Sequence, residues 1–311
     1  MTKAVFIGEC MVEFSPVADA TYRRSFAGDT YNAAVYMKRC LQGQAHISYM
    51  TAVGDDTVSD AMISSFMSEG LDCGDVYRLT RGTPGAYMIS TDNEGERSFS
   101  YWRRDAAAKE MVRLMRAQNR SLSKSGADLI FFSGISLAIL DDDSRAGLLD
   151  DIAEARDGGA TIAFDPNYRP RLWESADEAR HWLDRAYRLT DIAFPGMEEE
   201  GALYSTADPY DALERMQVYG CKEIVLKAGD AGMFVRDDSM TVHLPFTPAR
   251  QVVDTTAAGD SFDGAYLAAW LEGADAGAAL RQAAEIAAVV VGLPGAIAPR
   301  AEFDQARDNL T

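Results

Sequence analysis

A stretch of small and polar residues near the C-terminus could carry phosphoryl-transfer chemistry. It reads DTTAAGDSFDGAYLA over residues 254–268 and runs from a polar turn into an apolar, helix-forming segment. Ala257, Ala258 and Gly259 have little or no side chain, so backbone N–H groups at the start of that helix can converge on an anion. Asp260 follows in the first turn, where its carboxylate can accept a proton from an attacking hydroxyl. An ordinary N-capped helix with an acidic first turn would use the same residues.

Other nucleotide-binding motifs do not occur in the chain. No GxxxxGK[ST] is present, so the chain is not a P-loop NTPase. The first predicted strand ends in GEC rather than leading into GxGxxG, which argues against a simple dinucleotide-binding enzyme.

Short apolar runs alternate with segments of helical period along most of the chain, which favours a mostly parallel sheet with helices on both faces. The runs predict buried strands at Ala4–Ile7, Ile47–Val53, Leu129–Ser133, Thr161–Phe164, Ile192–Phe194 and Ile224–Lys227. The segments between and after them predict helices at Asp29–Leu41, Asp55–Glu69, Asp143–Arg156, Ala176–Leu189, Tyr210–Tyr219 and Phe262–Leu271.

Two stretches, Cys10–Phe26 and Asp75–Trp102, break this alternation with short β-type runs and turn residues. We expect them to form a small separate sheet, built from about 9–26 and 75–105, within one domain over 1–311. Their aromatic residues suit either a lid over a site or an edge hairpin that packs on the core.

Composition limits the partners of the protein. The 311 residues carry a net charge of −18, which repels nucleic acid and anionic membrane surfaces. An anionic substrate would therefore need local arginines. No apolar run approaches the roughly 20 residues that a membrane span requires.

Four scattered cysteines and three histidines make a zinc site or a disulfide framework improbable. The N-terminus begins as a strand rather than a signal peptide. We expect a cytoplasmic protein.

The full string at 254–268 resembles the C-terminal signature of the ribokinase-like (PfkB) carbohydrate kinases, and further segments match in order from residue 5 to about 300. The resemblance implies a ribokinase-like fold with a β lid, ATP and Mg2+ as cofactors, and Asp260 as the base beside an anion hole at 257–259. In this family lids often pair between subunits, so a homo-oligomer through the lid is plausible. Many members have Gly where this chain has Ala257, and the alanine is tolerable if the residue does not need a positive φ.

The resemblance also assigns the nucleotide side of the site. In VLKAGDAGMF, Lys227 and Gly229 lie near the phosphates together with Gly259, and Gly232 lets the nucleotide approach the backbone. A plain β-hairpin would use the same glycines. Asn167 lies near the phosphate path.

The family's NxxE motif helps to hold magnesium through water. It falls at FPGMEEE, where Glu199 is the acid and Gly196 replaces the asparagine. An acidic run at a helix start is otherwise a favourable interaction with the helix dipole.

Two short segments carry the sugar contacts by the same resemblance. Gly28 and Asn32 in FAGDTYNAA contact substrate hydroxyls, and Tyr87 in GAYMIS is a lid tyrosine at the sugar. A helix cap with a buried amide is the alternative for Asn32.

Three further residues resemble the branch of the family that acts on 2-keto-3-deoxygluconate. Tyr101 and Arg103 in SYWRRDAAA match its Y-x-R pair, and Arg169 in FDPNYRPRLW matches an arginine at the substrate carboxylate. A guanidinium binds a carboxylate through two parallel hydrogen bonds, which a neutral sugar does not require.

The resemblance implies phosphorylation of 2-keto-3-deoxy-D-gluconate at its 6-hydroxyl by MgATP. Two alternatives stay open: a kinase for fructose or another keto-sugar, and a non-catalytic sugar-acid sensor on the same fold. Asp260 argues against the sensor, because binding alone does not require a base.

Overall fold

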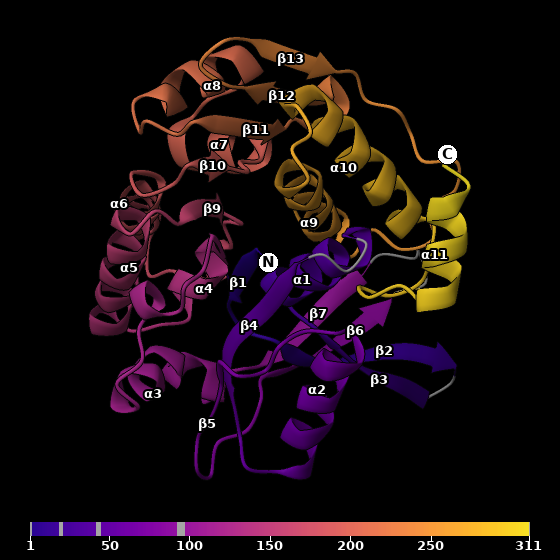
Figure 1. Ribbon diagram of the computed structural model, residues 1–311. Helices are drawn as coiled ribbons and strands as arrows, with labels where there is room; N and C mark the ends of the chain where they lie inside the picture. Colours follow the sequence, from indigo (N-terminus) through magenta and orange to yellow (C-terminus); the bar gives the residue numbers. More distant parts are fainter. Residues whose placement is uncertain (1, 19–20, 42–44, 92–96, 311) are drawn as a thin grey trace.

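The large sheet of the protein is mostly parallel. The structure is a computed structural model that describes residues 2–18, 21–41, 45–91 and 97–310 (Figure 1). Within them, a nine-stranded sheet has the order β13-β12-β11-β10-β9-β8-β1-β4-β5. Its strands are β1 (Lys3–Ile7), β4 (His46–Val53), β5 (Val76–Arg78), β8 (Leu129–Ser133), β9 (Thr161–Asp165), β10 (Ile192–Ala193), β11 (Glu223–Lys227), β12 (Met233–Arg236) and β13 (Thr241–Leu244).

The parallel pairing extends from β11 to β5. Only the pairs β11–β12 and β12–β13 are antiparallel among the described strands of this sheet. The predicted parallel sheet is therefore confirmed, and each predicted run falls on a strand. Side chains that follow the carboxyl ends of these strands meet at one edge of the sheet, where open α/β folds bind their ligands.

Helices cover both faces of the sheet, and alternate strand residues fill a separate hydrophobic core on each side. Ile7 and Phe132 point into one core and Phe6 and Phe131 into the other. The first core is closed by α3 (Met111–Ala117), α4 (Gly134–Ala138), α5 (Asp142–Asp157), α6 (Ala176–Tyr187), α7 (Met197–Tyr204) and α8 (Pro209–Gln217). The second is closed by α1 (Asp29–Cys40), α2 (Thr57–Ser68), α9 (Ala258–Leu271), α10 (Ala276–Val291) and α11 (Arg300–Asp308).

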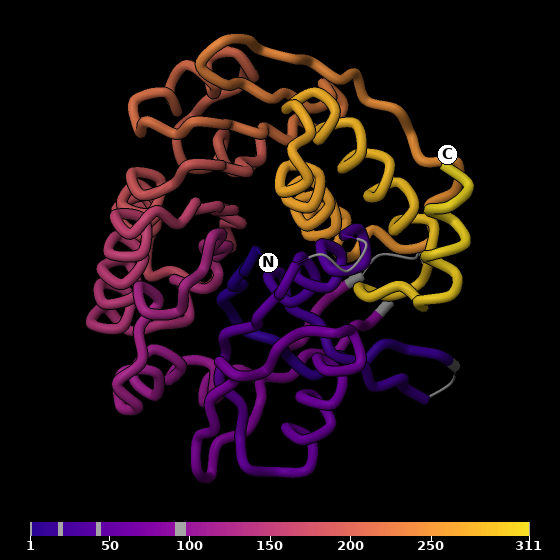
Figure 2. The backbone as a smooth tube through the Cα atoms, viewed as in Figure 1, coloured from indigo at the N-terminus to yellow at the C-terminus, as the bar shows by residue number. Residues whose placement is uncertain are grey.

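Segments from the two ends of the chain are neighbours among the helices that close the second core. Figure 2 shows the C-terminal helix α9 beside the N-terminal helix α1, on which it packs directly, and α10 packs on α9. This packing places the start of α1 against the start of α9. Two of the predicted site segments, 28–32 and 257–260, are therefore brought together.

A second, four-stranded sheet lies apart from the first (Figure 1). Its order is β3-β2-β6-β7, formed by β2 (Met11–Ala18), β3 (Thr21–Ala27), β6 (Ala86–Thr91) and β7 (Arg97–Trp102). The expected boundary at 75 is wrong, because β5 pairs with β4 at the edge of the large sheet. The apolar run at 76–78 is too short to reveal by pattern which sheet it joins.

One face of the small sheet covers the beginning of α9. Met11, Tyr87 and Ile89 are buried together with Ala296, and Ala257 packs against this cluster. The hydrophobic effect therefore holds the small sheet over the turn that carries the predicted anion hole. This is the arrangement that a lid requires.

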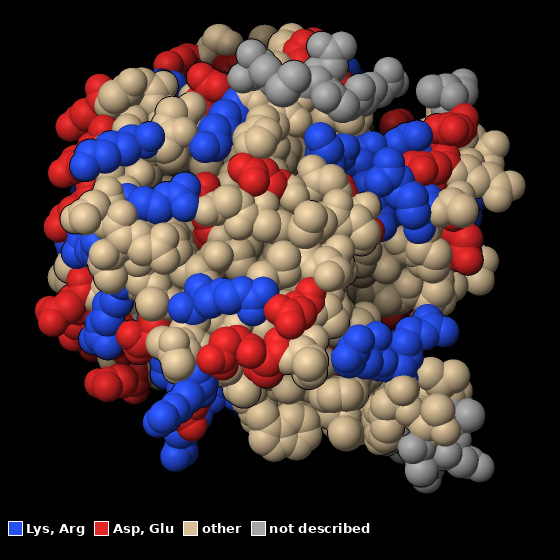
Figure 3. Space-filling view, turned by 60° about the horizontal axis from the view of Figure 1, so that its bottom comes forward, with Lys and Arg blue, Asp and Glu red and all other residues tan. Residues whose placement is uncertain are grey.

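The surface is acidic but mixed. On the face in Figure 3, basic and acidic side chains are interspersed, and acidic ones are most numerous along the left margin. Among the described residues, none of the helices is long and apolar enough to cross a membrane.

Candidate active site

Asp260 is bound to the start of helix α1. Asn32 Nδ2 donates a 2.8 Å hydrogen bond to Asp260 Oδ2, across 228 positions of sequence. The backbone N–H of Gly28 donates to Asn32 Oδ1 at 3.4 Å, which orients the amide. A side chain at residue 28 would place its Cβ 2.1 Å from the backbone oxygen of Glu9, so only glycine fits there. The Gly28 turn, Asn32 and Asp260 therefore form one unit.

The turn before α9 has the shape of an anion hole. Ala257 is the N-cap and has a left-handed backbone with φ +61°. The first i→i−4 hydrogen bond runs from Ser261 N–H to the Ala257 oxygen at 2.8 Å. The N–H groups of Gly259 and Asp260 precede that bond and lie at the positive end of the helix dipole. A left-handed residue next to right-handed ones makes such N–H groups converge, as in anion-binding nests.

Alanine at position 257 was expected to be tolerated in place of the family's glycine only if this residue does not need a positive φ. The φ of Ala257 is positive, so that condition is not met. A left-handed alanine costs about 1–2 kcal/mol because Cβ crowds the neighbouring carbonyl oxygen. The turn therefore stores strain at the predicted anion hole.

The carboxylate of Asp260 has the protonation behaviour of a base near neutral pH. Burial, then repulsion from Asp29, raises its pKa to about 7, although the Asn32 hydrogen bond opposes the shift. Burial also raises the pKa of Asp29. A base is most effective when its pKa lies near the working pH, and Asp260 meets that condition.

Lys227 lies at the start of α9 but is held by carboxylates. Its Nζ lies 2.9 Å from Asp165 Oδ2 and 3.1 Å from Asp263 Oδ1. A Cβ atom added at Gly259 would lie 3.8 Å from the same Nζ, so the ammonium group is next to the first turn of α9. Burial alone would lower the pKa of Lys227, but these carboxylates raise it. Asp263 was not predicted, because one acidic residue on an apolar helix gives no sign of its partner.

The two glycines after Lys227 have different reasons to be glycine. Gly229 has φ +52° at the start of a short 3-10 turn, η4 (Gly229–Ala231). Gly232 has φ +88°, and a Cβ there would lie 2.3 Å from the backbone oxygen of Leu244. The pairing of β12 with β13 therefore already explains Gly232. Its role at the nucleotide stays a prediction.

Asn167 lies in a tight turn after β9. Its φ is +33°, its N–H donates to Asp165 Oδ1 at 2.9 Å, and its Nδ2 donates to Asp29 Oδ2 at 3.0 Å. Asn and Asp tolerate left-handed backbone better than most residues. Asn167 therefore links the loop after β9 to the first turn of α1.

Glu199 lies in the first turn of helix α7, next to the same loop. Its carboxylate accepts hydrogen bonds from the N–H of Tyr168 at 3.0 Å and of Gly196 at 3.3 Å. Burial, then repulsion from Asp165, raises its pKa to about 8. A cation beside Glu199 would relieve both effects.

The lid tyrosine Tyr87 is buried and donates to Glu13 Oε2. Ser25 donates to the other oxygen of Glu13 at 2.9 Å. Tyr101 lies opposite Tyr87 on β7, with ring centroids 5.8 Å apart, and is half-exposed. Glu13 was not predicted, although a carboxylate in the apolar segment GECMVEF was a usable signal.

Arg103 follows β7 and donates to Glu9 Oε2. Glu9 follows β1 of the large sheet, so this ion pair joins the end of β7 in the small sheet to the large sheet. Burial raises the pKa of Glu9, and the guanidinium opposes that shift. Glu9 is a second carboxylate that was not predicted.

Arg169 lies exposed in the loop after β9, and no ion pair is formed by it among the described residues. Its charge acts on Asp29 and Glu199, which places it beside the predicted site. The guanidinium is thus available to a ligand.

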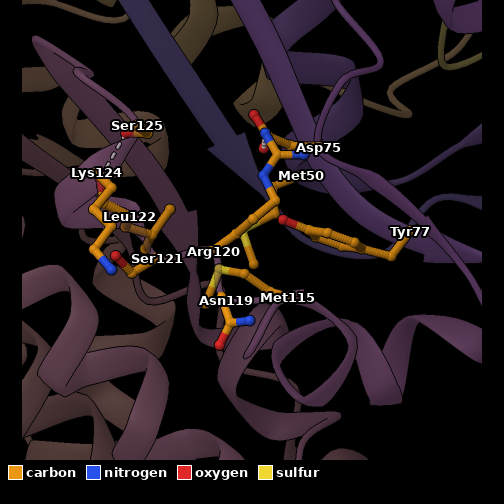
Figure 4. A pocket seen from close by; sticks show the side chains of 10 residues that line it. All are labelled: Met50, Asp75, Tyr77, Met115, Asn119, Arg120, Ser121, Leu122, Lys124 and Ser125. Carbon is orange, nitrogen blue, oxygen red and sulfur yellow. Dashed lines mark hydrogen bonds and ion pairs between the residues drawn. The ribbon is translucent and has the colours of Figure 1, made fainter. Parts of the chain in front are cut away.

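A small cavity of about 190 Å³ lies elsewhere (Figure 4). It contains none of the predicted site residues. Most of its lining comes from β5 with Asp75 before it, from the end of α3, and from residues 119–125, which precede β8. Arg120 fills one side of it in an ion pair with Asp75 at 2.6 Å. The predicted site around Asp260 is therefore separate from this cavity.

The chain belongs to the pfkB family of carbohydrate kinases, which matches residues 1–302. It is 40% identical over 297 residues to the 2-dehydro-3-deoxygluconokinase of Dickeya dadantii, covering 94% of this chain and 96% of that one. It is 38% identical over 302 residues to the enzyme of that name in Escherichia coli K12, covering 96% and 97%. In fold it is similar to the Escherichia coli protein called ribokinase II in complex with ATP and Mg2+, with a TM-score of 0.85, 23% identity and coverage of 99% and 100%.

Proposed function

We propose that the protein transfers a phosphoryl group from ATP to the 6-hydroxyl of 2-keto-3-deoxy-D-gluconate, also called 2-dehydro-3-deoxygluconate. The Asn32–Asp260 hydrogen bond at the N-terminus of α9 carries the proposal, because it orients a base with a pKa of about 7 beside an anion hole. Relatives with 38–40% identity that are named for this activity support the choice of substrate.

In the proposed reaction Asp260 accepts the proton of the sugar hydroxyl as the hydroxyl oxygen attacks the γ-phosphate. Asn32 keeps the carboxylate in place, and the N–H groups of Gly259 and Asp260 stabilise charge on the transferring group. Lys227, held between Asp165 and Asp263, stabilises charge on the phosphates. Arg103 and Arg169 bind the substrate carboxylate, which compensates locally for the net charge of −18.

The residues present fit a magnesium ion that is bound mainly by ATP and water. Mg2+ commonly uses one or two protein carboxylates and retains several waters. Glu199 would act through water, and a cation there would offset its burial and its repulsion by Asp165, which together raise its pKa to about 8. When bound, the ion would neutralise charge on the phosphates.

A substrate panel tests the proposal. ATP turnover is measured with 2-keto-3-deoxygluconate, its C4 epimer 2-keto-3-deoxygalactonate, fructose and ribose. We expect kcat/KM to be highest for 2-keto-3-deoxygluconate and the two neutral sugars to be poor substrates. Preference for fructose would support the keto-sugar alternative, and binding without turnover would support the sensor.

We further infer that two copies pair through their lids. Trp102 on the edge strand β7 is 57% exposed, and Phe99 and Tyr101 on the same strand are 40% and 49% exposed. An edge strand with exposed aromatic side chains offers backbone hydrogen bonds and apolar area that a second copy can bury. Sedimentation should give a dimer that Trp102→Glu converts to a monomer; a monomeric wild type would contradict the inference.

A further inference from the structure

The carboxylate of Glu9 lies where the lid meets the core, and only one of its oxygens is bonded. Oε2 accepts a hydrogen bond from Arg103. Oε1 is buried and has no hydrogen-bond partner among the described residues. The side chain is only 1% exposed. Buried polar atoms of folded proteins are almost always hydrogen-bonded, so this oxygen calls for a partner.

The surroundings of Glu9 are those of the predicted sugar site. On the core side, a Cβ at Gly28 would lie 2.1 Å from the Glu9 backbone oxygen. On the lid side, a Cβ at Gly85 would lie 2.6 Å from Oε1, two residues before Tyr87. Asp29 is near enough to raise the pKa of Glu9. Glu9 therefore lies between the turn that leads to Asn32 and the strand that carries the lid tyrosine.

We propose that Glu9 is a specificity-determining residue of the sugar site, with Oε2 holding Arg103 and Oε1 accepting a hydrogen bond from a substrate hydroxyl. The inference rests on the proposed function, because it takes Arg103 to bind the substrate carboxylate. Both roles use the charge of one carboxylate. Replacement of Glu9 would therefore affect both the position of Arg103 and the recognition of the hydroxyl. The two effects can be measured separately.

The chemistry of the substrate identifies the hydroxyl. In open-chain 2-keto-3-deoxygluconate, C1 is the carboxylate, C2 is a carbonyl and C3 is a methylene. The first hydroxyl from the Arg103 end is therefore at C4. With the carboxylate at Arg103 and the 6-hydroxyl at Asp260, the C4 hydroxyl would be the donor nearest to Glu9. Glu9 thus selects for the C4 hydroxyl.

A double-perturbation cycle tests this role. The value of kcat/KM is measured for wild type and Glu9→Gln with 2-keto-3-deoxygluconate and with its 4-deoxy analogue. Glutamine has nearly the same shape, and its amide oxygen can still accept from Arg103. It then presents an uncharged amide N–H2 where Oε1 was. We expect the 4-deoxy analogue to be about 10- to 100-fold poorer for wild type. For Glu9→Gln the penalty should fall below about fivefold.

A purely structural role predicts a different pattern. If Glu9 only holds Arg103, Glu9→Gln lowers kcat/KM for both substrates by the same factor, since both carry the carboxylate. Equal 4-deoxy penalties in the two proteins would therefore overturn the proposal. Glu154→Gln, an exposed substitution on α5, is the matched control and should leave both values unchanged.

The wild type alone also tests the proposal if Glu9→Gln does not fold. Wild type that uses the 4-deoxy analogue as well as the parent sugar acid overturns the role of Glu9 and leaves the proposed function intact. Wild type that phosphorylates neither compound overturns the proposed function, and this inference with it.

Discussion

Replacement of Arg169 by alanine should weaken binding of the sugar acid and spare ATP. Arg169 is exposed and forms no ion pair among the described residues, so a substrate carboxylate does not have to displace a partner. Binding of the substrate then forms charge-assisted hydrogen bonds between Arg169 and that carboxylate without breaking an ion pair within the protein. Such bonds contribute about 1.5–3 kcal/mol, which corresponds to an increase in KM of about 10- to 100-fold.

Arg103 gives an instructive contrast. Its guanidinium already holds Glu9, so Arg103→Ala would leave a buried carboxylate without its partner. Removing one member of a buried ion pair is strongly destabilising. We therefore expect Arg103→Ala to lower the thermal unfolding temperature as well as the affinity, whereas Arg169→Ala changes affinity alone.

The assay is steady-state ADP release with varied sugar acid at saturating MgATP, and then with varied ATP. Arg169→Lys should be nearly as impaired as Arg169→Ala, because an ammonium cannot make two parallel hydrogen bonds. Arg171→Ala is the matched control, since Arg171 is also exposed and lies two residues away. An unchanged KM for the sugar acid in Arg169→Ala, or an equal rise in Arg171→Ala, would refute the assignment.

Three further predictions follow from the site. The value of kcat/KM should fall about tenfold per pH unit below about pH 7, because Asp260 of the free enzyme is then protonated and cannot act as base; a flat profile from pH 5 to 8 would contradict this. Ala257→Gly should change the unfolding temperature by no more than about 1 °C, since relief of about 1–2 kcal/mol of strain is offset by added chain entropy and by lost packing of the Ala257 methyl group on the small sheet; a fall of several degrees would argue against strain. Tyr87→Phe should lower the free energy of unfolding by about 1–3 kcal/mol in urea denaturation, because Glu13 Oε2 loses its buried donor; Ser25→Ala, at the other oxygen, should cost less because Ser25 is only partly buried.

The strands of the large sheet were predictable because they depend on the local sequence pattern. Continuous apolar runs such as Leu129–Ser133 mark strands buried on both faces, and the structure has those strands. The alanine-rich helix α10 (Ala276–Val291) was not predicted, because its small residues give little contrast between faces. The short strand β5 (Val76–Arg78) was assigned to the wrong sheet for want of length.

The contacts between site residues that are far apart in the sequence could not be predicted from the local sequence pattern. The contact between Asn32 and Asp260 spans 228 positions and depends on α1 packing against α9. Family resemblance named both residues without giving their contact. The partners Glu9 and Glu13 stand as acids in the apolar segment GECMVEF, which indicates burial, but the sequence does not give the groups that they bind. Asp263 was not predicted for the same reason.

The most direct test of the account is Asp260→Asn, measured for turnover and for binding. The asparagine can still accept the hydrogen bond from Asn32, so the fold and the binding of sugar acid and ATP should be retained within about threefold by calorimetry. Loss of the general base should lower kcat by about 10² to 10⁴. A variant that binds both ligands and turns over at a rate near that of wild type would contradict Asp260 as the base.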